Sequence, residues 1–201
     1  MKISEVKTAF KIADVEFVEG STKLNFNYLK ELKDENGKTL PQKILSENVA
    51  RVYLIVVDGE IKKIGGSGVL GGIKSTLEIY RDGGGVKGRP SIRSFGVWYF
   101  LYHTILEGKN IEFYMIYQEN FEKEVKGLFG LKKVKNVSIS YKFIEQCCIE
   151  DYLNFENSKF SEWNVQEQGM DWPLDIKNEH VLIQQNAQSR EKKIIRQEAK
   201  R

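Results

Sequence analysis

The sequence is poor in the features that mark secreted, membrane-spanning or zinc-bound proteins. Its 201 residues include two cysteines, Cys147 and Cys148, whose adjacency disfavours a structural disulfide, and two thiols alone make no zinc site. No apolar run approaches the roughly 18 residues of a membrane-spanning helix. The N-terminal segment is charged from its start and has no apolar signal-peptide block. We therefore expect a cytoplasmic protein.

Histidine is also scarce, with two in the chain, and neither stands in a recognisable Ser-His-Asp or Cys-His context. This absence argues against the common nucleophilic hydrolases. Hydrophobic residues make up 41% and charged residues 29% of the sequence, which is ordinary for a globular protein and argues against general disorder. The length suits one domain with a sizeable core, with or without appendages.

The formal net charge is only +3, but positive charge is unevenly distributed along the chain. Lysine and arginine outnumber acids in segments 62–93 and 185–201, and the remainder is net acidic. Concentrated positive charge attracts a phosphate backbone. Two solvated basic surfaces explain the same pattern, so the distribution alone leaves both interpretations open.

The pattern of apolar and turn residues predicts a mixture of strands and helices. Residues 51–57 are rich in β-branched and aromatic residues, and the turn Asp58-Gly59 joins them to a second strand over 60–64, which indicates a β-hairpin. The other expected elements are a short helix over 73–80, a glycine-rich basic loop over 81–90, a helix over 91–107 capped by Ser91, a strand over 111–117, a charged irregular segment over 118–137, a strand over 137–143, a helix over 144–155, a loop over 157–173 and a helix over 185–201.

The predicted hairpin and the helix after it carry a recognisable motif. Tyr53 stands on the first strand, the segment Lys63-Ile64-Gly65-Gly66-Ser67 follows on the second, and Tyr80 ends the helix. This arrangement resembles the GIY-YIG nuclease superfamily, with lysine in place of the second tyrosine as in some small restriction endonucleases. Segments 31–37 and 105–114 also resemble the phage endonuclease II branch, so the resemblance covers roughly residues 28–165.

The resemblance implies an α+β fold with a small central antiparallel sheet flanked by helices. It divides the chain into an N-terminal extension (1–50), a nuclease core (51–165) and a basic C-terminal appendage (166–201). It also implies an endonuclease, such as a type II restriction enzyme, that cuts double-stranded DNA with Mg²⁺, for which Mn²⁺ can substitute. The catalytic residues implied are Tyr53, Lys63, Tyr80, Glu150 and Asn164, with Glu150 as the metal ligand.

The choice of glutamate is open in the sequence. Glu145 and Glu150 both lie in the helix expected over 144–155, and both precede apolar residues as the family glutamate does. They are five residues apart, about 140° around a helix, so they do not share a face. Glu150 is favoured because it lies closer to Asn164. A surface glutamate in a salt bridge is the ordinary alternative for either position.

Phosphodiester hydrolysis requires an activated water, a cation beside the phosphoryl oxygens and a stabilised leaving group. Tyr53 and Lys63 are about equally far from the hairpin turn, so they can be cross-strand neighbours. If both face one side, the lysine charge would lower the tyrosine pKa and the pair would relay a proton from water. Otherwise Tyr53 is a core residue, Lys63 is a surface residue and Asn164 caps a turn.

One departure from the family pattern bears on catalysis. The family helix carries an arginine about four residues before its tyrosine, where this chain has Thr76. Lys74, Arg81 or Arg93 can supply the missing charge from elsewhere, or the chain is a non-catalytic DNA-binding module that retains the fold. The residues expected to bind DNA are Lys74, Arg81, Lys87, Arg89 and Arg93. A palindromic target would require a homodimer or sequential nicking by a monomer.

Overall fold

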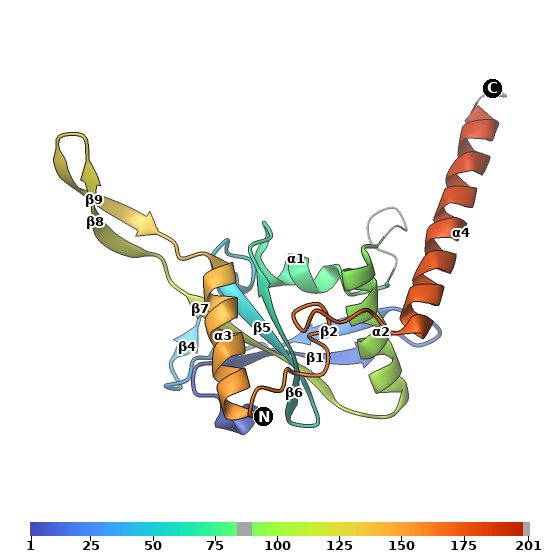
Figure 1. Cartoon of the computed structure of the whole chain (residues 1–201), viewed down its shortest axis with the longest axis horizontal. Helices are drawn as coiled ribbons and strands as arrows, with labels where there is room; N and C mark the ends of the chain where they lie inside the picture. The colour runs from blue at the N-terminus through green and yellow to red at the C-terminus, as the bar shows by residue number, and fades with distance from the viewer. Residues whose placement is uncertain (84–89, 199–201) are drawn as a thin grey trace.

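The computed structural model describes residues 1–83 and 90–198, and its centre is a five-stranded antiparallel sheet (Figure 1). The strand order is β2-β1-β7-β5-β6. The strands are β1 (Phe10–Phe17), β2 (Leu24–Tyr28), β5 (Ala50–Val57), β6 (Glu60–Ser67) and β7 (Ile111–Gln118). The α+β class and the central antiparallel sheet predicted from the sequence are confirmed.

Helices cover both faces of this sheet. The helices are α1 (Gly72–Glu78), α2 (Ile92–Leu106), α3 (Tyr141–Phe155) and α4 (Leu174–Glu198). The smaller elements are η1 (Ile3–Glu5), η2 (Gln42–Leu45), the pair β3 (Leu32–Lys33) and β4 (Thr39–Leu40), and the pair β8 (Phe121–Gly127) and β9 (Gly130–Val137). Within the part of the chain that is described, no helix is long and apolar enough to cross a membrane.

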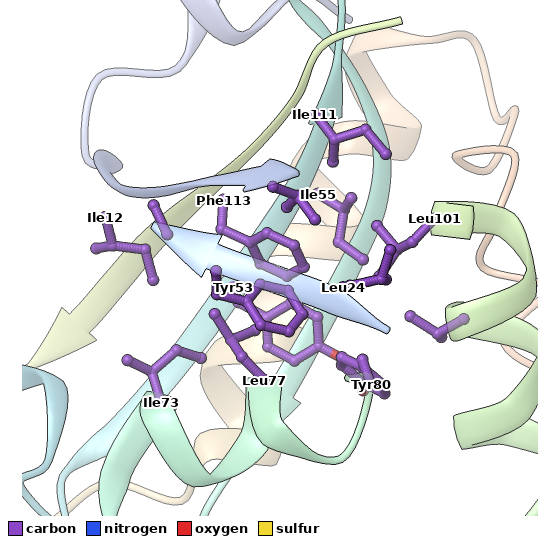
Figure 2. Close-up of a cluster of buried hydrophobic side chains, with 14 of the residues drawn as sticks. Ile12, Leu24, Tyr53, Ile55, Ile73, Leu77, Tyr80, Leu101, Ile111 and Phe113 are labelled. Carbon is purple, nitrogen blue, oxygen red and sulfur yellow. The ribbon is translucent and has the colours of Figure 1, made fainter. Parts of the chain in front are cut away.

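Strand β5 is buried along its whole length because each face of it supports a different core. Tyr53, Ile55 and Val57 point into the core shared with α1 and α2, where Tyr53 lies close to Tyr80 and Leu77 (Figure 2). The alternate residues of β5 pack against α3 on the other face. Two-sided burial explains why this strand reads as a continuous apolar run rather than an alternating one.

Strand β6 is at the edge of the sheet, and the segment after α3 pairs with its outer side. The Trp163 amide donates to the Lys62 carbonyl at 2.8 Å. The Asn164 side chain accepts from the Ile64 amide and donates to the Ile64 carbonyl, each at 2.8 Å. These bonds satisfy backbone groups that an edge strand would otherwise expose. They also fix residues 163–167 beside the second half of the motif.

The observed bounds agree with most of the elements predicted between residues 51 and 117. The hairpin strands and the helix from Ile92 are present, and Ser91 caps that helix by accepting a hydrogen bond from the Ser94 amide at 3.1 Å. Residues 1–50, expected to be an extension, contribute β1 and β2 to the central sheet.

Three predicted elements differ from the structure. The helix expected over 185–201 begins earlier, at Leu174. The strand expected over 137–143 is absent, because β9 ends at Val137, residues 138–140 form a connection and α3 begins at Tyr141. The segment 118–137, expected to be irregular, forms the β8–β9 hairpin. Its many lysines and glutamates obscure the strand pattern, since both faces of the hairpin are exposed and neither requires apolar residues.

Gly65 is required by the close approach of Tyr53. The two residues are directly paired across β5 and β6, and a Cβ at Gly65 would lie 2.4 Å from both Cζ and Oη of Tyr53. We expect Gly65→Ala to lower the free energy of unfolding by about 1–3 kcal/mol, the usual cost of overpacking a core. Urea denaturation measures this change.

Gly127→Ala is the matched control for this substitution. Its added Cβ would lie 3.2 Å from the flexible end of Lys132 and 3.4 Å from the Gly130 carbonyl oxygen, which is an ordinary contact distance. The control variant should stay close to the wild type in stability. Equal stability of the two variants would show that the Tyr53 ring moves aside without cost.

Candidate active site

Tyr53 and Tyr80 form a buried hydroxyl pair at one end of the motif. Their Oη atoms are 2.7 Å apart, and either can be the donor. Tyr53 comes from the middle of β5, and Tyr80 follows the last turn of α1. Burial raises the pKa of both phenols, and for Tyr53 the neighbouring Tyr80 raises it further. Both side chains are therefore neutral at physiological pH.

This result corrects the expectation that Lys63 lowers the pKa of Tyr53. The two side chains do share a face, because Tyr53 pairs with Gly65 and Ile55 pairs with Lys63. However, the loss of hydration around a fully buried phenol outweighs the attraction of nearby cations. A partly ionised Tyr53 is not part of this site.

Lys63 is the side chain of the pair whose pKa moves toward neutrality. It is 1% exposed, and its Nζ donates to the Trp163 carbonyl at 3.4 Å. Its nearest carboxylate is Glu167, at 3.9 Å. Burial lowers the pKa of Lys63 to about 8, so about a tenth of it is neutral at pH 7. Such a group can accept a proton near physiological pH.

Three charged side chains from three different elements meet beside the lysine and the tyrosines. Arg93, in the first turn of α2, holds Glu167 at 2.9 Å and lies 4.0 Å from Glu145 of α3. The Gly66 amide donates to Glu145 Oε1 at 2.5 Å. The charges of Arg93 and Glu145 both contribute to the pKa shifts of the three ionisable motif residues, Tyr53, Lys63 and Tyr80. The six side chains thus form one cluster, called here the β6 cluster: Tyr53, Lys63, Tyr80, Arg93, Glu145 and Glu167.

Glu150 lies outside the contacts of the β6 cluster. It is on the exposed side of α3, and its Oε1 accepts a hydrogen bond from Gln146 at 2.9 Å. It shares an open surface hollow of about 420 Å³ with Glu145 and Glu167. The structure thus brings Glu145, and not Glu150, to the second strand of the motif. The reason is that Glu145 lies one turn into α3, where the helix passes Gly66.

Asn164 is buried and holds the backbone rather than facing the hollow. Besides its two bonds to Ile64, its Oδ1 accepts from Ser161 Oγ at 2.5 Å. This side chain therefore anchors the loop to β6. In the same loop, three residues after Asn164, Glu167 forms its ion pair with Arg93.

The residues expected to bind DNA separate into three groups. Lys74 lies over the Tyr28 ring at 5.2 Å, and Arg81 pairs with Glu78 at 2.6 Å, so both are outside the β6 cluster. Lys87 and Arg89 lie outside the described residues. Arg93 belongs to the cluster and keeps 44% of its side chain exposed, so it can also reach a bound ligand.

Glu167 is a member of the cluster that the sequence does not predict. This glutamate is in an irregular segment with no periodicity, and the only available signal is its position three residues after Asn164. Arg93 was one of three open candidates for the missing family arginine. Its capped position at the start of α2 places it opposite Glu145 and Glu167.

The carboxylates of the cluster set limits on a metal site. Among residues 1–83 and 90–198, no group of three or more histidine, cysteine, aspartate or glutamate side chains is placed to hold a metal ion. Glu145 uses Oε1 for the Gly66 amide, while its Oε2 has no hydrogen-bond donor among the described residues. One available carboxylate oxygen beside an open hollow fits a hard divalent cation that keeps most of its water shell.

Comparisons with known proteins give limited information. No family model and no curated protein matches the chain. A solved structure of a mutant of bacteriophage T4 EndoII has a TM-score of 0.46 and 13% identity, covering 82% of this chain and 99% of its own. Restriction endonuclease HPY188I in complex with product DNA has a TM-score of 0.43 and 22% identity, covering 79% and 83% respectively. No assignment for this chain rests on similarities this weak.

The buried charge of Lys63 should cost stability at neutral pH. Its pKa falls from 10.5 in the unfolded chain to about 8 when folded, which corresponds to about 3 kcal/mol. Below pH 8 both states are protonated and the penalty is fully present. Between pH 8 and 10.5 the unfolded chain binds more protons, so the penalty disappears as pH rises. We expect Lys63→Met to unfold at higher urea than the wild type at pH 7, with a gain that shrinks toward pH 10.5.

Lys62→Met provides the comparison from the adjacent position. Lys62 is paired with Glu162 at 2.9 Å, so its loss should give no gain at pH 7. A Lys63→Met variant that is less stable than the wild type at pH 7 would contradict the assigned pKa.

Proposed function

We propose that this chain is a metal-dependent endonuclease that hydrolyses phosphodiester bonds of double-stranded DNA. The observation that carries the proposal is the β6 cluster, in which six chemically useful side chains meet, one each from β5, β6, the turn after α1, α2, α3 and the loop after α3. The motif resemblance singles out Tyr53, Lys63 and Tyr80 independently of this geometry.

In this proposal, Glu145 holds one Mg²⁺, for which Mn²⁺ can substitute. The bound cation would offset the negative charge on the phosphoryl oxygens. Arg93 lies 4.0 Å from Glu145 and is partly exposed, so its guanidinium can hold a second oxygen of the same phosphate. Glu167 orients Arg93 through their 2.9 Å ion pair.

Lys63 and the tyrosine pair act on the attacking water. A neutral Lys63 accepts a proton from this water, whose oxygen then forms the new bond to phosphorus while the bond to the leaving sugar oxygen breaks. The neutral Tyr53 and Tyr80 hydroxyls supply hydrogen bonds that position the water. Tyr80 is the more accessible of the two, at 7% exposure against 2% for Tyr53.

A type II restriction role is a narrower form of the same proposal and requires base recognition in addition to cleavage. The parts of the chain outside the β6 cluster are available for that recognition. The non-catalytic alternative, a DNA-binding module that retains the fold, makes a different prediction. Such a protein would bind DNA and leave it uncut with Mg²⁺ present.

Replacement of Glu145 should separate catalysis from binding. We expect Glu145→Gln to reduce Mg²⁺-dependent nicking of supercoiled plasmid by at least about 100-fold, with DNA affinity within a few-fold of the wild type, because the shape is kept while the ligand charge is lost. Glu150→Gln is the matched control on the same helix and should remain active. Excess chelator should stop the wild type.

An inactive Glu150→Gln beside an active Glu145→Gln would move the metal ligand to the exposed side of α3. A wild type that binds DNA without nicking it would favour the non-catalytic module.

The rate of the wild type should follow the protonation of Lys63. A base must be deprotonated to act, so the single-turnover rate should rise about tenfold per pH unit below pH 8 and level off above it. Lys63→Met should remove this dependence and lower the rate by about 100-fold or more. A rate that falls as pH rises from 6 to 8 would show that Lys63 acts as an acid.

A further inference from the structure

The hairpin of β8 and β9 projects from the body of the protein, away from the central sheet (Figure 1). All seven residues of β8 and the first seven of β9 are exposed. An isolated two-stranded hairpin has marginal stability in water because it buries little apolar surface. A hairpin with no packing role of its own is suited to contact another molecule.

The charge of the hairpin favours an anionic partner. Residues 121–137 hold five lysines and two glutamates, an excess of three positive charges that equals the formal net charge of the whole chain. Glu122 is already shared by Lys133 at 3.1 Å and Lys135 at 3.9 Å. The other three lysines, Lys123, Lys126 and Lys132, form no ion pair with a described residue.

The register divides these charges between the two faces of the hairpin. Lys123 pairs with Val134, and Val125 pairs with Lys132, so one face carries two lysines, two valines and no acid. The other face holds the cross-strand pair of Glu124 and Lys133. One face of the hairpin is thus purely basic and apolar.

The tip of the hairpin is apolar and almost fully exposed. Leu128 is 94% and Phe129 is 95% exposed, and they form the turn between the strands. Leu131 follows at 66%. Turn geometry does not require these residues, since the flanking Gly127 and Gly130 supply the backbone freedom and Gly130 takes a φ of +116°. Large apolar side chains grouped in this way mark an interaction site.

The base of the hairpin adjoins the β6 cluster. Strand β9 ends at Val137, and α3 begins at Tyr141, so Glu145 follows within about two helical turns. Eight residues of strand extend about 26 Å, so the tip reaches roughly eight base pairs along B-form DNA from its base.

We propose that the β8–β9 hairpin is a DNA-contacting arm that enters a groove of the duplex held at the β6 cluster. This inference rests on the proposed nuclease function. Lys123, Lys126 and Lys132 contact phosphates, and Leu128 and Phe129 press against a base step. The major groove of B-form DNA admits a two-stranded ribbon, and exposed leucine and phenylalanine side chains can wedge between bases and bend the duplex.

Lysine substitutions test the phosphate contacts. In the Glu145→Gln background, which binds without cutting, DNA affinity is measured against salt concentration for a triple alanine variant of Lys123, Lys126 and Lys132. Each lost phosphate contact should lower the salt slope by about 0.9. The control is a triple alanine variant of Lys7, Lys30 and Lys38, which are exposed lysines outside the hairpin and should leave the slope unchanged.

A tip variant tests the base contact. Leu128→Ser combined with Phe129→Ser should weaken binding about tenfold or more at constant salt slope. It should also abolish the fluorescence rise of 2-aminopurine placed within ten base pairs of the cut. Both substituted residues are exposed, so circular dichroism and the unfolding midpoint should not change.

The outcomes distinguish the arm from the function on which it rests. If the Glu145→Gln protein binds DNA and both hairpin variants behave like the control, the proposal that the hairpin contacts DNA is wrong and the nuclease proposal stands. If the protein with intact Glu145 neither binds nor cuts DNA, both proposals fail. If the tip variant leaves DNA binding intact and instead changes the sedimentation coefficient, the tip is a contact between copies of the chain.

Discussion

The outer edge of β6 is the constraint on which the rest of the site depends. Edge strands present unpaired amide and carbonyl groups. Here the loop after α3 pairs with them, and the Asn164 side chain forms both hydrogen bonds to Ile64 that a neighbouring strand would form. On the same edge, the Gly66 amide donates a hydrogen bond to the Glu145 carboxylate. Because one strand edge anchors both the loop and the carboxylate, the charged groups meet only when this edge is correctly paired.

The site combines neutral and charged groups by controlling their burial. Burial keeps the Tyr53 phenol protonated, and it lowers the pKa of Lys63 to about 8. Arg93 and Glu167 remain partly exposed, and their opposite charges neutralise one another in an ion pair. Burial of the charged form of Lys63, whose nearest carboxylate is that of Glu167 at 3.9 Å, is unfavourable for folding.

Polar and apolar surfaces are also divided between the body and the hairpin. The body places its apolar residues in two cores on opposite faces of the sheet. The β8–β9 hairpin instead exposes Leu128 and Phe129 beside lysines that form no ion pair with any described residue. Helix α3 connects the hairpin to the central sheet. Its first turns pass Gly66, and three residues separate its start from the end of β9.

The sequence by itself determined the local features of this protein. The turn at Asp58-Gly59 and the β-branched run before it specify the β5–β6 hairpin, and the Ser91 cap specifies the start of α2. These features rest on interactions between residues close in the chain, which patterns of residue type record directly. The same patterns indicated that Tyr53 and Lys63 can be cross-strand neighbours, and the register of the folded hairpin then put both side chains on one face.

Tertiary structure decided the membership and the ionisation of the site. Glu145 and Glu150 are equivalent in sequence context, and only the packing of α3 against β6 brings the first to Gly66. Glu167 joins Arg93 from a loop without any periodic signal. The pKa of Tyr53 depends on the hydration lost to residues far away in the chain. Such contacts between distant segments leave no local pattern, so the folded chain alone determines them.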